Sequence, residues 1–214
     1  MIVLRALGTS EIETEVATLT PSQEIVFAAA LYLVLERGRR VSRARLASML
    51  WPRIPDKKRA HRLRQTILQM KKLGVVVNAD RDNLQLAQHE ARTDMDEVLA
   101  ADPATVLEHH SLEFLPGYNP RLSEALCDWV DSKRAEAHAT ATGVLVHALE
   151  QSRLQADWSK VERIAAKCLS LDSYNETAIL AQAEAAAMRG GKRRAVSILD
   201  RYIADGRFQA PRIT

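Results

Sequence analysis

Apolar and polar positions in the first twenty residues alternate only in part, in two short runs. Residues 2–8 read IVLRALG and residues 11–19 read EIETEVATL, which predicts two short strands. Thr20, Pro21 and Ser22 follow, and a proline near the first turn suits the start of a helix. We therefore expect a small N-terminal sheet ahead of the first helix.

Three helices are expected after this sheet. From Ser22 onward apolar residues recur at helical spacing until Gly38, a residue that commonly ends helices. Ser42 can cap a short second helix that runs through Leu50. A third helix is expected over residues 56–73. Its inner stripe would consist of Ala60, Leu63, Ile67 and Met70.

A hairpin is expected after the third helix. Residues 75–77 (VVV) and 84–87 (LQLA) flank the polar run NADRDN, the pattern of two strands joined by a turn. The order of strands, three helices and hairpin is that of a winged helix-turn-helix, which we expect over residues 1–87.

The second half of the chain has a helical pattern from about Thr93, so a domain boundary is expected between Ala87 and Thr93. FLPGYNP at 114–120 interrupts it, and a long helix is expected over 121–154. Val161, Ala165 and Cys168 then match Ala195, Leu199 and Tyr202 at an offset of 34 residues, a period typical of tetratricopeptide-type (TPR) helix pairs. The expected fold class is mainly α, with an all-α TPR-like domain over residues 93–214.

The distribution of charge says more than its total. The net charge is +3, but residues 37–72 hold thirteen Lys or Arg against Asp56 alone, which leaves −9 for the rest. A basic block beside an acidic remainder indicates a unit that binds a polyanion. The two cysteines lack metal or redox spacing, and no leader or membrane span is recognisable, so we expect a cytoplasmic protein.

The polar face of the third helix is the main candidate site, because a helix fits the DNA major groove and such side chains pair with bases and phosphates. Arg62, Gln65 and Gln69 are the expected base readers, and Lys58, Lys71 and Lys72 are expected at phosphates. Beyond the helix, Arg43 and Arg45 could contact the phosphate backbone of the DNA, and Arg81 could reach a minor groove. The full expected set is Lys58, His61, Arg62, Gln65, Gln69, Lys72, Arg43, Arg45 and Arg81. The alternative is that these side chains form an ordinary solvent-exposed helix face and bind nothing.

The same residues carry a family resemblance. LTPSQEIVFAAALYLVLERGRRVSRARLASMLWP, HRLRQTILQMKKLG, FLPGYNPRLSEALCDWVDSKRAE and DWSKVERIAAKCLSLDSYNETA, in this order, resemble the SARP-type bacterial transcriptional activators. The resemblance implies a winged-helix domain similar to that of response regulators, followed by a bacterial transcriptional activator domain. It implies double-stranded DNA as a partner, binding as a homodimer on direct repeats, and regulation or RNA polymerase contact by the helical domain.

Two other classes of function stay open. A protein-interaction scaffold would use the TPR-like half and would have lost DNA recognition. RNA binding is less favoured, because no aromatic stacking platform accompanies the basic stripe. An enzyme is not expected, since the six histidines are scattered and no phosphate-binding glycine loop or nucleophile motif occurs. We accordingly expect no catalytic residues, metal or cofactor.

Overall fold

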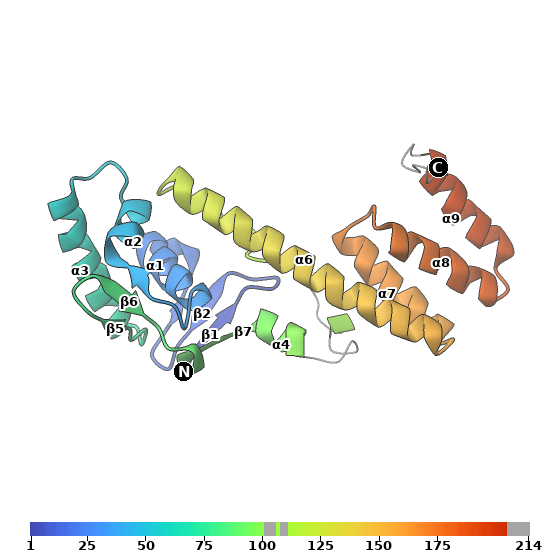
Figure 1. Cartoon of the computed structure of the whole chain (residues 1–214), viewed down its shortest axis with the longest axis horizontal. Coiled ribbons are helices and arrows are strands. Elements are labelled where there is room, and N and C mark those ends of the chain that lie inside the picture. The colour runs from blue at the N-terminus through green and yellow to red at the C-terminus, as the bar shows by residue number, and fades with distance from the viewer. Residues whose placement is uncertain (101–105, 108–110, 205–214) are drawn as a thin grey trace, which may run out of the picture. The chain divides into compact units, whose positions relative to one another are not determined.

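The computed structural model describes residues 1–100, 106–107 and 111–204 (Figure 1). The chain is mainly helical and carries small β elements in its N-terminal part, as expected. Two compact units divide it: residues 1–100 with 111–137, and residues 101–110 with 138–214. These units do not coincide with the expected ranges 1–87 and 93–214.

The main sheet of the first unit explains this difference. Its strand order is β3-β2-β1-β7, from β3 (Thr18–Leu19), β2 (Glu11–Glu13), β1 (Ile2–Arg5) and β7 (Ala91–Thr93). β1 pairs antiparallel with β2 and parallel with β7. The expected boundary between Ala87 and Thr93 therefore lies within a folded unit, because β7 supplies one edge of its sheet. The helical pattern expected from Thr93 begins one residue later, at α4 (Asp94–Ala100).

Asp94 fastens α4 to the end of β1. Its side chain is buried, and its Oδ2 accepts hydrogen bonds from the backbone N–H groups of Ala6 and Leu7, both at 2.8 Å. The backbone N–H of Asp96 donates to Thr93 Oγ1 at 3.0 Å, and Thr93 N–H donates back to the Asp96 carboxylate at 2.7 Å. This reciprocal pair satisfies free amides at the helix start.

Three helices follow in the expected order. They are α1 (Glu24–Leu35), preceded by a 3-10 turn (Pro21–Gln23), α2 (Arg43–Leu50) and α3 (Asp56–Lys72). α1 is buried continuously from Phe27 to Val34, so it forms the centre of the core. Ser42 caps α2 as expected, its Oγ accepting from the N–H of Arg45 at 3.4 Å.

The inner face of α3 differs from the expected stripe. Leu63, Thr66 and Met70 are buried, whereas Ala60 is exposed and Ile67 is only half-buried. Thr66 was overlooked because it is polar. Its burial beside Leu63 and Met70 turns the helix about its axis relative to the expected orientation.

A second sheet has the order β4-β6-β5, with β4 (Val41–Ser42), β6 (Asn83–Gln85) and β5 (Asn78–Ala79) all antiparallel to their neighbours. The hairpin was thus expected in the right place, but its first strand was not. Residues 75–77 lie outside β5 because Val75 is fully buried and its N–H donates to Met70 at the end of α3. A further 3-10 turn (Gln88–Glu90) leads from β6 to β7.

The FLPGYNP segment interrupts the helical pattern, as expected. Phe114 forms an isolated bridge with Leu7, and Leu115 N–H donates to Ala6 at 2.7 Å. α6 (Glu124–Leu154) follows, close to the expected 121–154. Its first part belongs to the first unit, where the Trp129 ring lies 4.5 Å from that of Tyr32 and the indole N–H donates to Glu36.

The second unit is built from helices that pack on their sequence neighbours. α7 (Trp158–Leu171) packs on α8 (Glu176–Met188), and α8 packs on α9 (Lys192–Ala204). α7 and α9 begin 34 residues apart, in the register of the weak repeat. Their inner positions Val161 and Ala195 are both buried. In the described part of the chain no helix is long and apolar enough to span a membrane.

Candidate nucleic-acid interface

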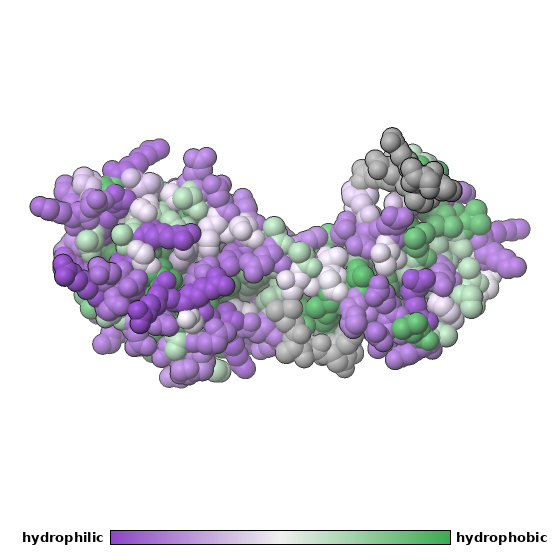
Figure 2. Space-filling view, viewed as in Figure 1, coloured by the Kyte–Doolittle hydropathy of each residue, from purple (hydrophilic) through white to green (hydrophobic). Residues whose placement is uncertain are grey.

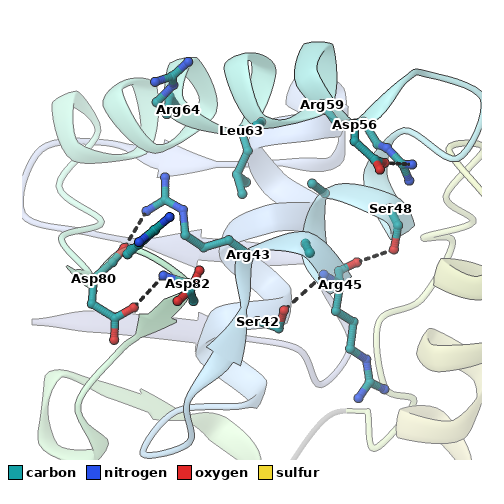
Figure 3. Close-up of a pocket in the computed structure, with 14 residues that line it drawn as sticks. Ser42, Arg43, Arg45, Ser48, Asp56, Arg59, Leu63, Arg64, Asp80 and Asp82 are labelled. Carbon is teal, nitrogen blue, oxygen red and sulfur yellow. Dashed lines mark hydrogen bonds and ion pairs between the residues drawn. The ribbon is translucent and has the colours of Figure 1, made fainter.

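The first unit contains an open hollow of about 890 Å³ bounded by α2, α3 and the turn between β5 and β6 (Figure 3). Its lining comes from Ser42 and most of α2, the first half of α3 and the turn residues. These residues are Ser42, Arg43, Ala44, Arg45, Ala47, Ser48, Asp56, Arg59, Ala60, Leu63, Arg64, Asp80, Arg81 and Asp82. Two consecutive helices and a turn that follows them in the sequence therefore share one surface.

The β5–β6 turn is held by Asp80. Its Oδ1 accepts from the backbone N–H groups of Asp82 at 2.8 Å and Asn83 at 2.6 Å. These hydrogen bonds hold the pKa of the Asp80 carboxyl below its usual value, because they favour the charged form. The carboxylate therefore stabilises its own turn. Arg81 lies at the tip of this turn, and its side chain is exposed.

Arg43 connects α2 to this turn. Its backbone N–H donates to the carbonyl of Asp82 at 2.9 Å, and its guanidinium donates to the carbonyl of Asp80 at 3.3 Å. Figure 3 shows Arg43 reaching toward the turn, whereas Arg45 points away from it. Of the two arginines expected beside α2, the structure therefore brings only Arg43 close to the turn.

All six residues expected on α3 are exposed, but they do not share one narrow face. Successive residues of an α-helix are about 100° apart. With Leu63, Thr66 and Met70 inward, the outermost positions are His61, Leu68 and Lys72. The other expected residues lie on the side of the helix that leads from these outermost positions toward Thr66. In order of increasing angle around the helix axis, they are Gln65, Lys58, Gln69 and Arg62.

Arg64 lies on the other side of the outermost positions. It is a lining residue of the hollow, and Lys57 and Lys71 fall on the same side at seven-residue spacing. Arg62 and Arg64 are two residues apart, so they point about 160° apart around the helix. The structure therefore groups Arg43 and Arg81 with Arg64 rather than with Arg62 or Gln69.

Most of the basic block is not neutralised by the protein itself. Arg37 pairs with Asp96 at 2.6 Å, Arg39 with Glu36 at 3.1 Å, and Arg59 with Asp56. The other ten of the thirteen form no ion pair with any residue that the structure describes. Figure 2 shows hydrophilic side chains over much of the visible surface of the first unit. The remaining positive charge is available to an external polyanion.

Three features of the site were missed from the sequence. Arg64 was left out because the expected face of α3 was rotated. The Arg59–Asp56 pair, which removes one cation from the surface, follows the three-residue spacing of helical pairs and could have been found. The exposed Leu68 was passed over because the sequence suggested only polar residues on the outer face.

Five arginines and three aspartates line the hollow. Its arginines supply fixed forks of N–H donors that match phosphate oxygens and guanine edges. Within the described ranges, no three His, Cys, Asp or Glu side chains gather as they would around a metal ion.

No known family model matches the sequence, and no curated protein matches it significantly.

Proposed function

We propose that this chain is a sequence-specific DNA-binding regulator of transcription, acting in the cytoplasm without a cofactor or a catalytic step of its own. The first unit would be a winged helix-turn-helix with α3 in the major groove. One observation carries the proposal: Arg43, Arg64 and Arg81 come from α2, α3 and the β5–β6 turn and border a single hollow. None of the three pairs with a carboxylate among the described residues.

The dimensions of α3 support this reading. A helix of 17 residues is about 25 Å long, and the major groove is about 12 Å wide, which admits one α-helix. With α3 in the groove, the N-terminus of α2 and the β5–β6 turn would lie over a phosphate backbone. Arg81 at the tip of the turn could then reach the adjacent minor groove.

The rotation of α3 assigns its side chains to different contacts. Since α2 and the turn lie on the hollow side, that side of α3 and its outermost positions would face the bases. His61 and Arg64 become the leading polar base readers, with Gln65 beside them. Arg62 and Gln69, expected at bases from the sequence, would lie nearer the far phosphate backbone, and so would Lys58.

The second unit would serve protein contacts. We propose that α7, α8 and α9 form a TPR-like platform for self-association or for RNA polymerase. Exposed apolar side chains at Met188, Val196 and Ile203 are compatible with this role. They are also the observation that favours the second candidate function, a scaffold that binds proteins and no DNA.

Selection of bound sequences from a random duplex pool tests the proposal. The enriched site is then titrated at 50 and 200 mM salt. With about five phosphate contacts, we expect affinity to fall roughly 500-fold between the two conditions. The double variant R64A/R81A should bind more weakly, and the sequence preference should relax at the base pair that Arg64 contacts.

A matched control is Arg92→Ala, which removes an exposed arginine of β7 in the first unit, outside the residues that line the hollow. It should leave both affinity and salt dependence unchanged. If no motif is enriched and only weak, sequence-independent binding is seen, the proposal is wrong and the scaffold is favoured.

A further inference from the structure

Leu68 occupies an unusual place on α3. Its side chain is 54% exposed, and it is the one large apolar side chain of this fully described helix that faces outward. Single exposed leucines are common on protein surfaces and usually have no functional role. Leu68 is a candidate for a functional role because it lies among the outermost residues of the helix proposed to enter the major groove.

The neighbours of Leu68 are polar. His61 precedes it by seven residues, Arg64 by four, and Lys72 follows by four, so these side chains flank it along the outer surface. All three are exposed. Any base pair that meets the middle of this surface would therefore meet one apolar group set between donors of hydrogen bonds.

The major groove offers one apolar partner for such a group. Base edges there present nitrogen and oxygen donors and acceptors, and the C5-methyl of thymine is their only apolar substituent. Against any other base edge, Leu68 would take water away from a polar atom and offer no hydrogen bond in return, which weakens binding.

We propose that Leu68 reads a thymine in the operator by packing on its C5-methyl group, and that Arg64 contacts a neighbouring base pair. This inference rests on the proposed function, because it requires α3 to lie in the groove. Residues 64 and 68 are about 6 Å apart along the helix axis, which corresponds to about two base-pair steps. The selected motif should accordingly contain a thymine within about two positions of the base pair that Arg64 contacts.

The test removes single methyl groups from the DNA. Each thymine of the selected operator is replaced in turn by deoxyuridine, which lacks the methyl and keeps the same base pairing. Burial of one methyl contributes about 0.8 kcal/mol, so wild-type affinity should fall about fourfold at one position. In Leu68→Ala the same replacement should have no effect, which would assign the methyl contact to Leu68.

Two comparisons separate this contact from general effects. Arg64→Ala should weaken binding and relax the preference at the base pair that Arg64 contacts, but retain the fourfold methyl effect. Leu68→Ala should retain the salt dependence of the wild type, because it removes no charge. Circular dichroism should show both variants folded, since both side chains are exposed.

The outcomes distinguish the two proposals. If the wild type enriches no motif, the proposed function fails and the thymine contact fails with it. If a motif is enriched but Leu68→Ala loses as much affinity as the wild type at every deoxyuridine position, DNA recognition by the chain stands and the role of Leu68 is refuted.

Discussion

Asp94 is the residue whose loss we expect to damage the first unit most sharply without touching the candidate interface. Its side chain is only 3% exposed, and one carboxylate oxygen accepts two backbone N–H groups, those of Ala6 and Leu7, at 2.8 Å. In Asp94→Ala both amides would lose this partner. Hydrogen bonds to a charged group contribute about 1.5–3 kcal/mol each, and relief of the buried charge offsets part of the loss. We therefore expect unfolding free energy to fall by about 3–4 kcal/mol.

Urea denaturation followed by tryptophan fluorescence can measure this change in the first unit alone. Trp51 and Trp129 belong to the first unit and Trp158 to the second, so a Trp158→Phe background leaves only reporters of the unit in question. Asp94→Asn should cost less than Asp94→Ala, because the amide oxygen can still accept from one or both backbone N–H groups.

The matched control is Asp128→Ala, which removes an exposed carboxylate from the part of α6 in the same unit. Exposed substitutions of this kind usually change stability by less than about 0.5 kcal/mol. A loss below about 1 kcal/mol in Asp94→Ala, or a loss equal to that of Asp128→Ala, would refute the role given to this carboxylate.

Two further predictions concern the backbone and the thiols. Gly74→Ala should destabilise by more than the 1–2 kcal/mol typical of a left-handed residue, because φ is +86° and the new Cβ would lie 2.8 Å from Thr14 Oγ1. Gly117→Ala, with φ +69° and open space around it, should cost only that strain; equal losses in urea melts would contradict the steric argument. Burial raises the pKa of the Cys168 thiol to about 11, so a thiol reagent at pH 8 should label the half-buried Cys127 first and Cys168 only on unfolding. Rapid native labelling of a Cys127→Ser variant would show that Cys168 is accessible.

Local signals predicted the three N-terminal helices well. Proline before α1, Ser42 before α2 and Gly74 after α3 act within one helical turn, so the sequence around them suffices. The break at 114–120 was predictable for the same reason, since proline removes the N–H that a helix would need.

β7 was missed because nothing local marks it. Its three residues are not an alternating run, and its partner β1 lies about ninety residues earlier in the chain. A parallel pairing of this kind depends on how the intervening helices return the chain to the sheet. The buried Asp94 was missed with it, because an aspartate at a helix start is usually read as a surface cap. The unit boundary placed at 87–93 followed from both omissions.

The candidate site was predicted on α3 with a different part of the helix surface facing outward, and one residue accounts for this difference. Choosing Ala60, Leu63, Ile67 and Met70 as the inner stripe places the outer face around Gln65 and Lys58, as an ideal helix requires. The buried set Leu63, Thr66 and Met70 shifts that face by roughly 45°, toward Leu68 and Arg64. Hydropathy alone ranks Ala60 above Thr66 for the interior. Only the packing of α3 against its neighbours determines which of the two is covered, and with it which side chains remain free to meet a partner.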